Sequence, residues 1–372
     1  MRTKIVALYP YYWPQYKAGG PVQSLYNLAA TFKDHADFYF ISLNKDIDGH
    51  LPDHPLRVNK WNPGPNNENI YCTSFLSPFL IFRLVRKVNP DVLMINGIFH
   101  WHTTLIGLLC GKVMGLKIVI SPRGMLQAWA LKRGKARKLL YLKALKLFVK
   151  ENEIWHATDE QERSDIYKMF GPTQQVHVAS NIPRPLGQPA SISFPDQLGK
   201  INLVFLSLIN PNKNLHLIID AINHGEGKFT LDMYGPVIDI NYWQLCQSKI
   251  KDASWISYKG AVPPWEVSKI LQQYHFFVLP TQGENFGHAI FDSLASGVPV
   301  IISRTTPWQE LDKWRAGIYV DPELPGSLRE ALQIVSDMTV DTYQEYRSNS
   351  SKYAKDYWNR KNYRVEYEWL FN

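Results

Sequence analysis

The sequence predicts an α/β protein built from two doubly wound, Rossmann-like domains. Strand-like and helix-like runs alternate along the chain, and this alternation begins again after residue 200. The length of 372 residues is long for one core and sufficient for two. We expect a first domain over 1–185, a second over 186–355, and a C-terminal helix over 356–372 that crosses back to the first domain. Two such domains that face each other enclose a cleft beyond the carboxyl ends of their strands.

The elements of the first domain follow from short apolar runs that are rich in β-branched and aromatic residues. The expected strands are 4–9, 37–43, 91–97, 117–121 and 154–158. Helical spacing predicts helices over 21–32 and 103–115. Because these runs alternate, a parallel sheet covered by helices is expected.

The second domain follows residues 182–200, which are rich in Pro, Gly and Ser, lack a helical period and predict a linker. The expected strands are 201–208, 229–235, 255–260, 275–280 and 298–303. The expected helices between them are 214–222, 241–251, 264–273 and 286–296. The final stretch, 342–372, is aromatic and helical in pattern, without a strand.

The net charge of +8 favours anionic partners. Much of the excess lies in "LKRGKARKLLYLKALKLFVK", residues 131–150, which contain eight basic residues and no acid. This segment is expected to form one amphipathic helix, either lying on an anionic membrane or packing its leucines inward with its lysines in solvent. Nucleic acid is not an expected partner, because aromatic residues do not interleave with the basic run.

The compartment predicted from the sequence is the cytoplasm, with peripheral contact at the inner face of the plasma membrane left open. The N-terminus lacks the pattern of a signal peptide, and no apolar run approaches the ~20 residues of a membrane helix. The three cysteines are scattered without metal-ligand spacing, which fits reduced thiols.

The strongest candidate site lies in "GENFGHAIFDSLASGVPVII", residues 283–302. A strand is expected to end just before it, and a helix to begin near Phe286. The amides of Phe286, Gly287 and His288 are then the unpaired donors of that helix and suit an anion. Glu284 lies in the preceding loop and Asp292 about one turn beyond His288. One acid suffices for a helix cap, so the second acid favours a functional site.

Two further loops contain candidate phosphate ligands. Lys213 follows an expected strand and precedes a helix, where a lysine can meet a phosphate. Gly19 and Gly20 stand before Pro21 at a helix start, where a ligand can approach the backbone. This loop is not a G-x-G-x-x-G fingerprint.

Taken together, these segments resemble the retaining GT-B glycosyltransferases of glycosyltransferase family 4. Glu284 and Asp292 form an E-x7-D version of the family's E-x7-E signature. "AGGPVQSLYNLA" and "VISPRGMLQAWAL" in the first half also resemble members that build bacterial surface polysaccharides, so the likeness extends over nearly the whole chain.

The resemblance implies an N-terminal acceptor domain and a C-terminal domain that binds a nucleotide diphosphate sugar. It implies that Glu284 contacts the sugar and Asp292 the ribose. It implies that Lys213, the glycine loop and residues 285–288, among them Asn285, hold the diphosphate. Glu284 and Lys213 are the expected catalytic residues of a hexosyltransferase that needs no metal or cofactor. The donor favoured is a UDP-sugar. The acceptor is a glycan or lipid-linked oligosaccharide of O-antigen, capsule or exopolysaccharide synthesis.

Two positions depart from the family pattern. Leu208 stands where the family usually has a second cation for the diphosphate, and Asn96 where many relatives have a histidine. We expect His100, His102 and Arg123 to be candidate replacements in acceptor or phosphate contacts.

Two other functions stay open at this level: a sugar-nucleotide epimerase of similar architecture, and a degenerate transferase that serves as a scaffold. The triplet Asp46-Ile47-Asp48 is interpreted as a solvated turn, not as a metal site.

Overall fold

The computed structural model describes residues 2–132, 134–186, 200–224, 227–251 and 254–371. The chain divides into two compact units: Met1–Ile182 together with Asn362–Asn372, and Pro183–Lys361. Each unit is an α/β layer structure around a mostly parallel sheet, so the predicted fold class is confirmed. Most of the linker predicted over 182–200 lies outside the described residues.

Unit 1 contains an eight-stranded sheet in the order β3-β4-β2-β1-β5-β6-β7-β8. Its strands are parallel except β3, which pairs antiparallel with β4. The strands are β1 (Thr3–Leu8), β2 (Ala36–Leu43), β3 (Trp61–Pro63), β4 (Asn69–Thr73), β5 (Val92–Asn96), β6 (Lys117–Ser121), β7 (Ile154–Ala157) and β8 (Gln175–Val178). The helices are α1 (Gly20–Phe32), α2 (Pro78–Val88), α3 (Trp101–Met114), α4 (Ala128–Lys132), α5 (Lys135–Phe148) and α6 (Glu160–Phe170), with α14 (Tyr363–Glu366) and α15 (Glu368–Phe371) from the C-terminus.

Unit 2 contains a six-stranded parallel sheet in the order β11-β10-β9-β12-β13-β14. The strands are β9 (Ile201–Leu206), β10 (Phe229–Tyr234), β11 (Ile256–Gly260), β12 (Phe276–Leu279), β13 (Val300–Ser303) and β14 (Gly317–Val320). The helices are α7 (Leu215–Asn223), α8 (Ile240–Lys249), α9 (Val267–Leu271), α10 (His288–Ala295), α11 (Leu311–Trp314), α12 (Ser327–Ser336) and α13 (Val340–Arg360), with short 3₁₀ turns η1 (Pro211–Lys213) and η2 (Pro264–Glu266).

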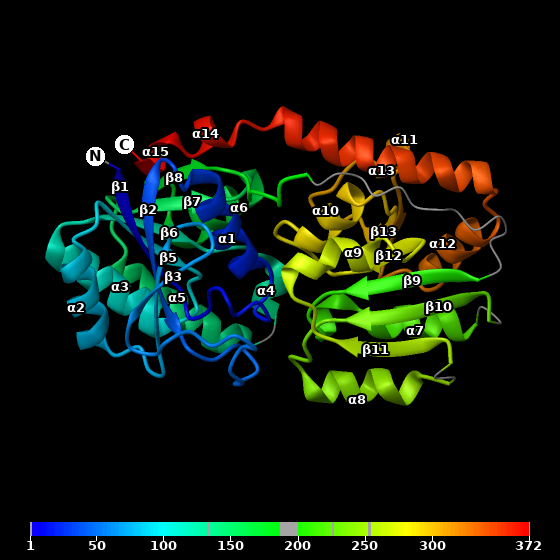
Figure 1. Ribbon diagram of the computed structural model, residues 1–372, viewed down its shortest axis with the longest axis horizontal. Helices are drawn as coiled ribbons and strands as arrows, with labels where there is room; N and C mark the ends of the chain where they lie inside the picture. The colour runs from blue at the N-terminus through cyan, green and yellow to red at the C-terminus, as the bar shows by residue number, and fades with distance from the viewer. Residues whose placement is uncertain (1, 133, 187–199, 225–226, 252–253, 372) are drawn as a thin grey trace. The chain divides into compact units, whose positions relative to one another are not determined.

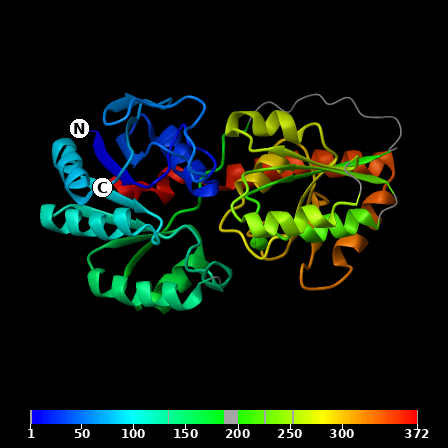
Figure 2. The same ribbon diagram turned by 90° about the horizontal axis from the view of Figure 1, so that it is seen from below.

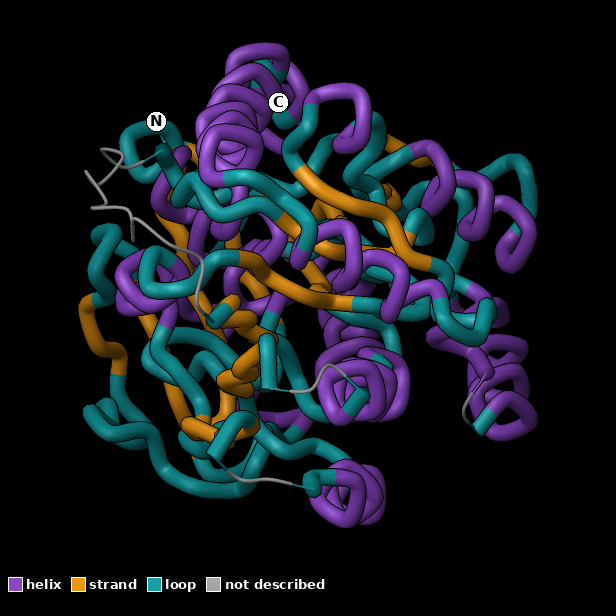
Figure 3. The backbone as a smooth tube through the Cα atoms, turned by 90° about the vertical axis from the view of Figure 1, so that its right-hand side faces the viewer, coloured by secondary structure: helices purple, strands orange, loops and turns teal. Residues whose placement is uncertain are grey.

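Helices cover both faces of the sheet in unit 2, as Figure 2 shows, and in Figure 3 the helices lie outside the strands. The central strands are therefore buried on both faces and read as continuous apolar runs, such as "FFVL" in β12. One large apolar core occupies unit 2, and it includes Phe205, Phe291 and Trp308.

The order of the strands decides which loops meet. In unit 2, β9 lies between β10 and β12, so the chain leaves the sheet in opposite directions from β9 and β12. Such a switch point leaves a crevice at the carboxyl ends of the two strands, where α/β proteins bind ligands. The loops after β9 and β12 contain Lys213 and Glu284.

The C-terminal helix predicted over 356–372 is not a single helix. α13 continues without interruption to Arg360 (Figure 1). Lys361 then has extended backbone angles, and the side chain of Asn362 accepts a hydrogen bond from the amide of Val365 to start α14. The segment after this break packs on unit 1, where the Tyr367 hydroxyl donates to the carbonyl of Ser180 over 3.0 Å.

The single basic helix predicted over 131–150 is also wrong. α4 ends at Lys132, and α5 begins at Lys135 after Gly134, which has a left-handed backbone (φ 68°). A glycine adopts that conformation without strain and interrupts the helix. Arg133 lies outside the described residues.

The prediction also missed strands β3, β4, β8 and β14, which have only three to five residues each and too few positions to show a period.

Candidate functional site

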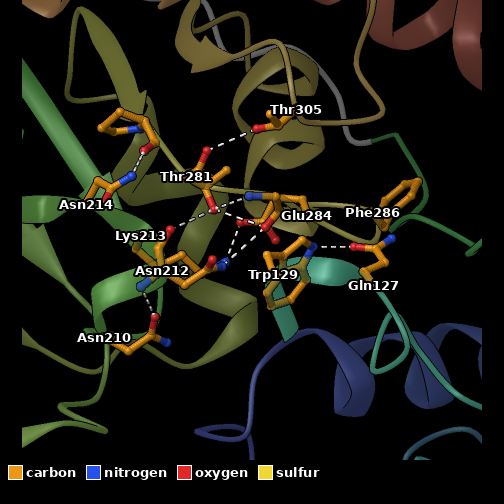
Figure 4. A network of polar contacts seen from close by, with 12 residues as sticks. Gln127, Trp129, Asn210, Asn212, Lys213, Asn214, Thr281, Glu284, Phe286 and Thr305 are labelled. Carbon is orange, nitrogen blue, oxygen red and sulfur yellow. Dashed lines mark hydrogen bonds and ion pairs between the residues drawn. The ribbon is translucent and has the colours of Figure 1, made fainter. Parts of the chain in front are cut away.

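Two loops of unit 2 are bonded to each other beneath the candidate site (Figure 4). The amide of Gln282 donates to the carbonyl of Asn212 over 2.9 Å, and the side-chain amide of Asn214 donates to the carbonyl of Pro280 over 2.8 Å. The Thr281 hydroxyl bonds the carbonyl of Gly283 over 3.0 Å. These contacts fix the loop after β9 against the loop after β12.

Lys213 and Glu284 form an ion pair across these loops, with Lys213 Nζ donating to Glu284 Oε1. Their side chains are only 10% and 14% exposed. A charge pair that is largely removed from water interacts more strongly than a surface pair. The structure thus brings together the two residues that the sequence predicts to be catalytic.

The helix at this site begins later than predicted. α10 starts at His288, and Gly287 precedes it with left-handed angles (φ 77°, ψ 62°). The first backbone bond of this helix is donated by the amide of Ile290 to the carbonyl of Gly287. The amides at the start of α10 are therefore those of residues 287–289, one position further along than expected. Asn285 and Phe286 lie in the loop before it, Asn285 half-buried and Phe286 buried.

The aromatic residues under this loop hold it in place. The Trp308 indole donates from Nε1 to the carbonyl of Phe286 over 2.6 Å. The Phe286 ring packs edge-on to Trp308, with ring centres 5.1 Å apart, and Tyr357 of α13 stacks obliquely on Trp308 at 4.8 Å. The hydrogen bond and the ring contacts hold the Phe286 carbonyl towards Trp308, in the core of unit 2.

We predict that Gly287→Ala lowers the stability of the protein. A Cβ at this position would meet Ile290 Cδ1 at 2.8 Å, and the left-handed backbone costs an L-residue about 1–2 kcal/mol. We therefore expect a lower melting temperature, measured by thermal denaturation. Gly134→Ala is the matched control: it has a similar left-handed backbone, and a Cβ there would meet no described atom within 4 Å. If both variants lower the melting temperature equally, the contact with Ile290 adds nothing to the cost of the left-handed backbone.

Asp292 lies on α10 with a side chain that is 12% exposed. Arg184 Nη2 approaches its Oδ2 to 3.6 Å. Burial raises the pKa of the Asp292 carboxyl, and the Arg184 guanidinium opposes this rise. No described residue donates a hydrogen bond to either carboxylate oxygen.

The glycine loop of unit 1 is tied down by an acid that the sequence analysis assigned to solvent. Gly19 has φ 76° and ψ −137°, a conformation open to glycine, and it caps α1, whose first residue is Gly20. Asp46 is buried, and its Oδ2 accepts the amides of Tyr16 and Lys17 at 2.9 and 3.0 Å. The interpretation of Asp46 as a solvated residue is wrong, because its carboxylate shapes this loop.

Asn96 and Arg123 contact each other in unit 1. Arg123 Nε donates to Asn96 Oδ1 over 2.7 Å and its Nη1 to Asn181 Oδ1 over 2.8 Å. Arg123 is buried, with a left-handed backbone (φ 57°). The Arg123 guanidinium is thus held by the side-chain carbonyl oxygens of Asn96 and Asn181.

The two histidines do not lie together. His100 packs edge-on to Tyr9 and Tyr11, and burial lowers its pKa to about 4, so it is neutral at pH 7. His102 stacks on Trp101, with ring centres 3.5 Å apart, and its edge faces Phe75. His100 borders the end of β5, since a Cβ on Gly97 would lie 3.4 Å from the His100 ring.

Sequence reasoning missed the residues that support the site: Arg184, Asn212, Asn214, Thr281 and Trp308. An asparagine at a helix start is a common capping signal, but the Asn214 side chain makes no capping bond to α7 and instead donates to the carbonyl of Pro280. Arg184 could not be found from local pattern, because it is far from Asp292 in sequence. Within the described ranges, no three His, Cys, Asp or Glu side chains gather as metal ligands do. In those same ranges no helix is long and apolar enough to cross a bilayer.

Comparison with known proteins finds similarity in sequence and in fold. Residues 200–337 match the family described as glycosyl transferases group 1. An O-antigen chain mannosyltransferase B of Escherichia coli is 25% identical over 148 residues, 38% of each chain. An alpha-monoglucosyldiacylglycerol synthase of Streptococcus pneumoniae is 27% identical over 169 residues, 43% of this chain and 38% of the relative. The matches thus span well under half of the length of these curated relatives.

Among solved structures, HepE of Anabaena in complex with UDP and glucose superposes with a TM-score of 0.73. The superposition covers 99% of this chain and 98% of HepE, at 12% sequence identity. At that identity the likeness concerns the fold alone.

Proposed function

We propose that the chain transfers a hexose from a UDP-sugar with retention of anomeric configuration, because residues 200–337 match the glycosyl transferases group 1 and its two units have the GT-B fold. The observation that carries this proposal is the pairing of Lys213 with Glu284 beside the N-terminus of α10, at the switch point of the unit 2 sheet. The HepE structure with UDP and glucose, of the same fold, supports the choice of donor.

Stabilisation of the departing diphosphate is the main task of the site. The bond between the anomeric carbon and the diphosphate oxygen breaks, and negative charge develops on that oxygen. Lys213 supplies a full positive charge, and the amides at the start of α10 supply preoriented donors. Since Leu208 is apolar, Lys213 takes a larger share of this work than in relatives with a second cation.

The acceptor hydroxyl attacks on the face from which the diphosphate leaves. Its oxygen forms the new bond to the anomeric carbon, and its proton passes to the diphosphate oxygen. Glu284 orients the sugar hydroxyls and stabilises positive charge on the ring, and it does not attack. Before the donor binds, Glu284 and Lys213 neutralise each other; the diphosphate then replaces the carboxylate as partner of Lys213.

Nucleotide binding is the first test of the proposal. We expect UDP and a UDP-sugar to raise the melting temperature of the protein more than GDP, ADP or their sugars, because a ligand that binds only the native state stabilises it. Slow release of UDP from the sugar without acceptor would exclude an inactive scaffold, and a released sugar that keeps the donor's epimeric configuration would exclude an epimerase. If none of these nucleotides shifts the melting temperature, the proposed function fails.

We propose a glycan or lipid-linked oligosaccharide of bacterial surface polysaccharide synthesis as the acceptor. The names of the two curated relatives, an O-antigen mannosyltransferase and a glycolipid synthase, support acceptors of this kind. The outer face of α5 supports a membrane-bound acceptor, since it alternates exposed apolar and basic residues. Leu147 is 83% exposed, between Lys146 and Phe148. The neighbouring helix α3 exposes Leu109 and Val113.

Reversing two charges on this face is expected to remove membrane binding. Lys143 and Lys146 are exposed, whereas Lys138 Nζ donates to the carbonyl of Ala130 and is unsuitable for the test. Each lysine near an anionic surface contributes about 1 kcal/mol. The variant Lys143→Glu/Lys146→Glu should therefore bind phosphatidylglycerol vesicles at least about thirtyfold more weakly in sedimentation, since two attractive charges are lost and two repulsive ones are added.

The matched control for this variant is Lys269→Glu/Lys352→Glu, which makes the same change of net charge on exposed positions of unit 2. The control should sediment like the wild type. Equal binding by all three proteins would show that this face of α5 does not contact the membrane.

A further inference from the structure

The carboxylate of Asp292 is largely buried but has open hydrogen-bonding positions. Its side chain is 12% exposed, and no described residue donates a hydrogen bond to it. An ionised carboxylate has about four acceptor positions, and those of Asp292 are open to donors. A half-buried acid of this kind, on the second turn of α10, can accept donors that arrive with a ligand.

Arg184 balances the charge of Asp292 without filling these positions. The guanidinium lies 3.6 Å from Oδ2, within ion-pair range and beyond a hydrogen bond. It is the one cation within ion-pair distance of Asp292 among the described residues. The pair therefore supplies electrostatic attraction while both oxygens stay free to accept.

The backbone around Arg184 is stiff. Pro183 and Pro185 flank it, and each proline fixes its own φ near −65°. A residue before a proline is also restricted to extended conformations, so the freedom of Arg184 is low. Pro183 is buried, which anchors the segment at the start of unit 2. The backbone that carries Arg184 is thus restricted before any ligand binds.

We propose that Arg184 is a positioning residue that holds the Asp292 carboxylate by its charge, so that both of its oxygens can accept the vicinal hydroxyls of the donor's ribose. This inference rests on the proposed function, which supplies the nucleotide. A protonated carboxyl would turn one oxygen into a donor and lose the stronger, charge-assisted bonds to the ribose. Burial raises the pKa of the Asp292 carboxyl, and the Arg184 guanidinium opposes this rise, so the cation favours the charged form.

The test compares UDP with 2′,3′-dideoxyuridine diphosphate, which lacks both ribose hydroxyls, by titration calorimetry at pH 7. The wild type should bind UDP more tightly than the dideoxy compound. In Arg184→Gln we expect UDP affinity to fall about tenfold and dideoxy affinity to stay the same. Arg184→Lys should restore most of the preference for UDP, because the cation returns.

A double-mutant cycle separates this role from a general structural one. Asp292→Asn alone should lose the preference for UDP, and adding Arg184→Gln should cause no further loss. The matched control is Arg315→Gln, which removes an exposed arginine paired with Glu345 at 2.6 Å and should bind both ligands like the wild type.

Three results would overturn the inference. Equal losses for UDP and the dideoxy compound in Arg184→Gln would indicate a structural role. Unchanged UDP binding in Arg184→Gln, with weakened binding in Asp292→Asn, would leave the proposed function standing and remove Arg184 from it. A wild type that binds no nucleoside diphosphate would sink the proposed function and this inference with it.

Discussion

Lys213→Ala is expected to lower kcat by about 10²–10³-fold and to weaken UDP binding by about tenfold. Lys213 is the cation that the site places beside the α10 N-terminus, and Leu208 offers no second one. The variant also leaves Glu284, which is 14% exposed, without its ion-pair partner. A buried acid next to the diphosphate then repels it, which adds to the loss. Steady-state kinetics and UDP titration measure the two effects separately.

The control for Lys213→Ala is Lys249→Ala, which removes a lysine that pairs with Asp220 at 2.7 Å on the outer helices of the same unit. It should retain the kcat and UDP affinity of the wild type. A Lys213→Ala enzyme with unchanged kcat would show that the diphosphate leaves without this charge.

Glu284→Gln is expected to reduce transfer by about 10²–10³-fold while UDP binding stays equal or becomes tighter. The glutamine keeps the shape of the side chain and removes its charge. Lys213 is then no longer held by a carboxylate, so the diphosphate meets a cation that is already available. Weaker UDP binding in Lys213→Ala, with no loss of UDP binding in Glu284→Gln, is the signature of a pair that exchanges partners when the donor arrives.

Asp220→Asn serves as the control for Glu284→Gln, since it neutralises an acid of an ion pair away from the site. Normal turnover in Glu284→Gln would refute the role of Glu284 in orienting the sugar. A strong loss of UDP affinity in Glu284→Gln would instead show that the Glu284 carboxylate binds the nucleotide.

The sequence determined the fold class and most of the candidate residues, because both depend on local pattern. Buried strands such as "FFVL" and "VIIS" are short apolar runs bounded by loops, and the helix between them, α10, has its buried apolar residues at helical spacing. Glu284 and Lys213 are polar residues in the loops that follow such strands, and Asp292 lies one turn beyond His288 on the helix after the first of these loops. The family match over residues 200–337 agrees with the resemblance in the second half of the chain.

Local sequence pattern does not predict every helix boundary. The break at Gly134 and the start of α10 at His288 depend on left-handed glycines, which compete with a continuous helical period. α13 ends at Arg360 because Lys361 has extended backbone angles, and the side chain of Asn362 then caps the start of α14. The sequence contains these residues, but the helical spacing around them is strong enough to mask the interruption.

Only the tertiary structure decided which distant residues meet. The strand order that places β9 beside β12 brings Lys213 onto Glu284, and the path of the chain after Ile182 brings Arg184 to Asp292. In the same way, Asp46 reaches the amides of Tyr16 and Lys17. Such contacts come from the packing of whole elements, whose energies are summed over the core. No periodicity within one segment records them.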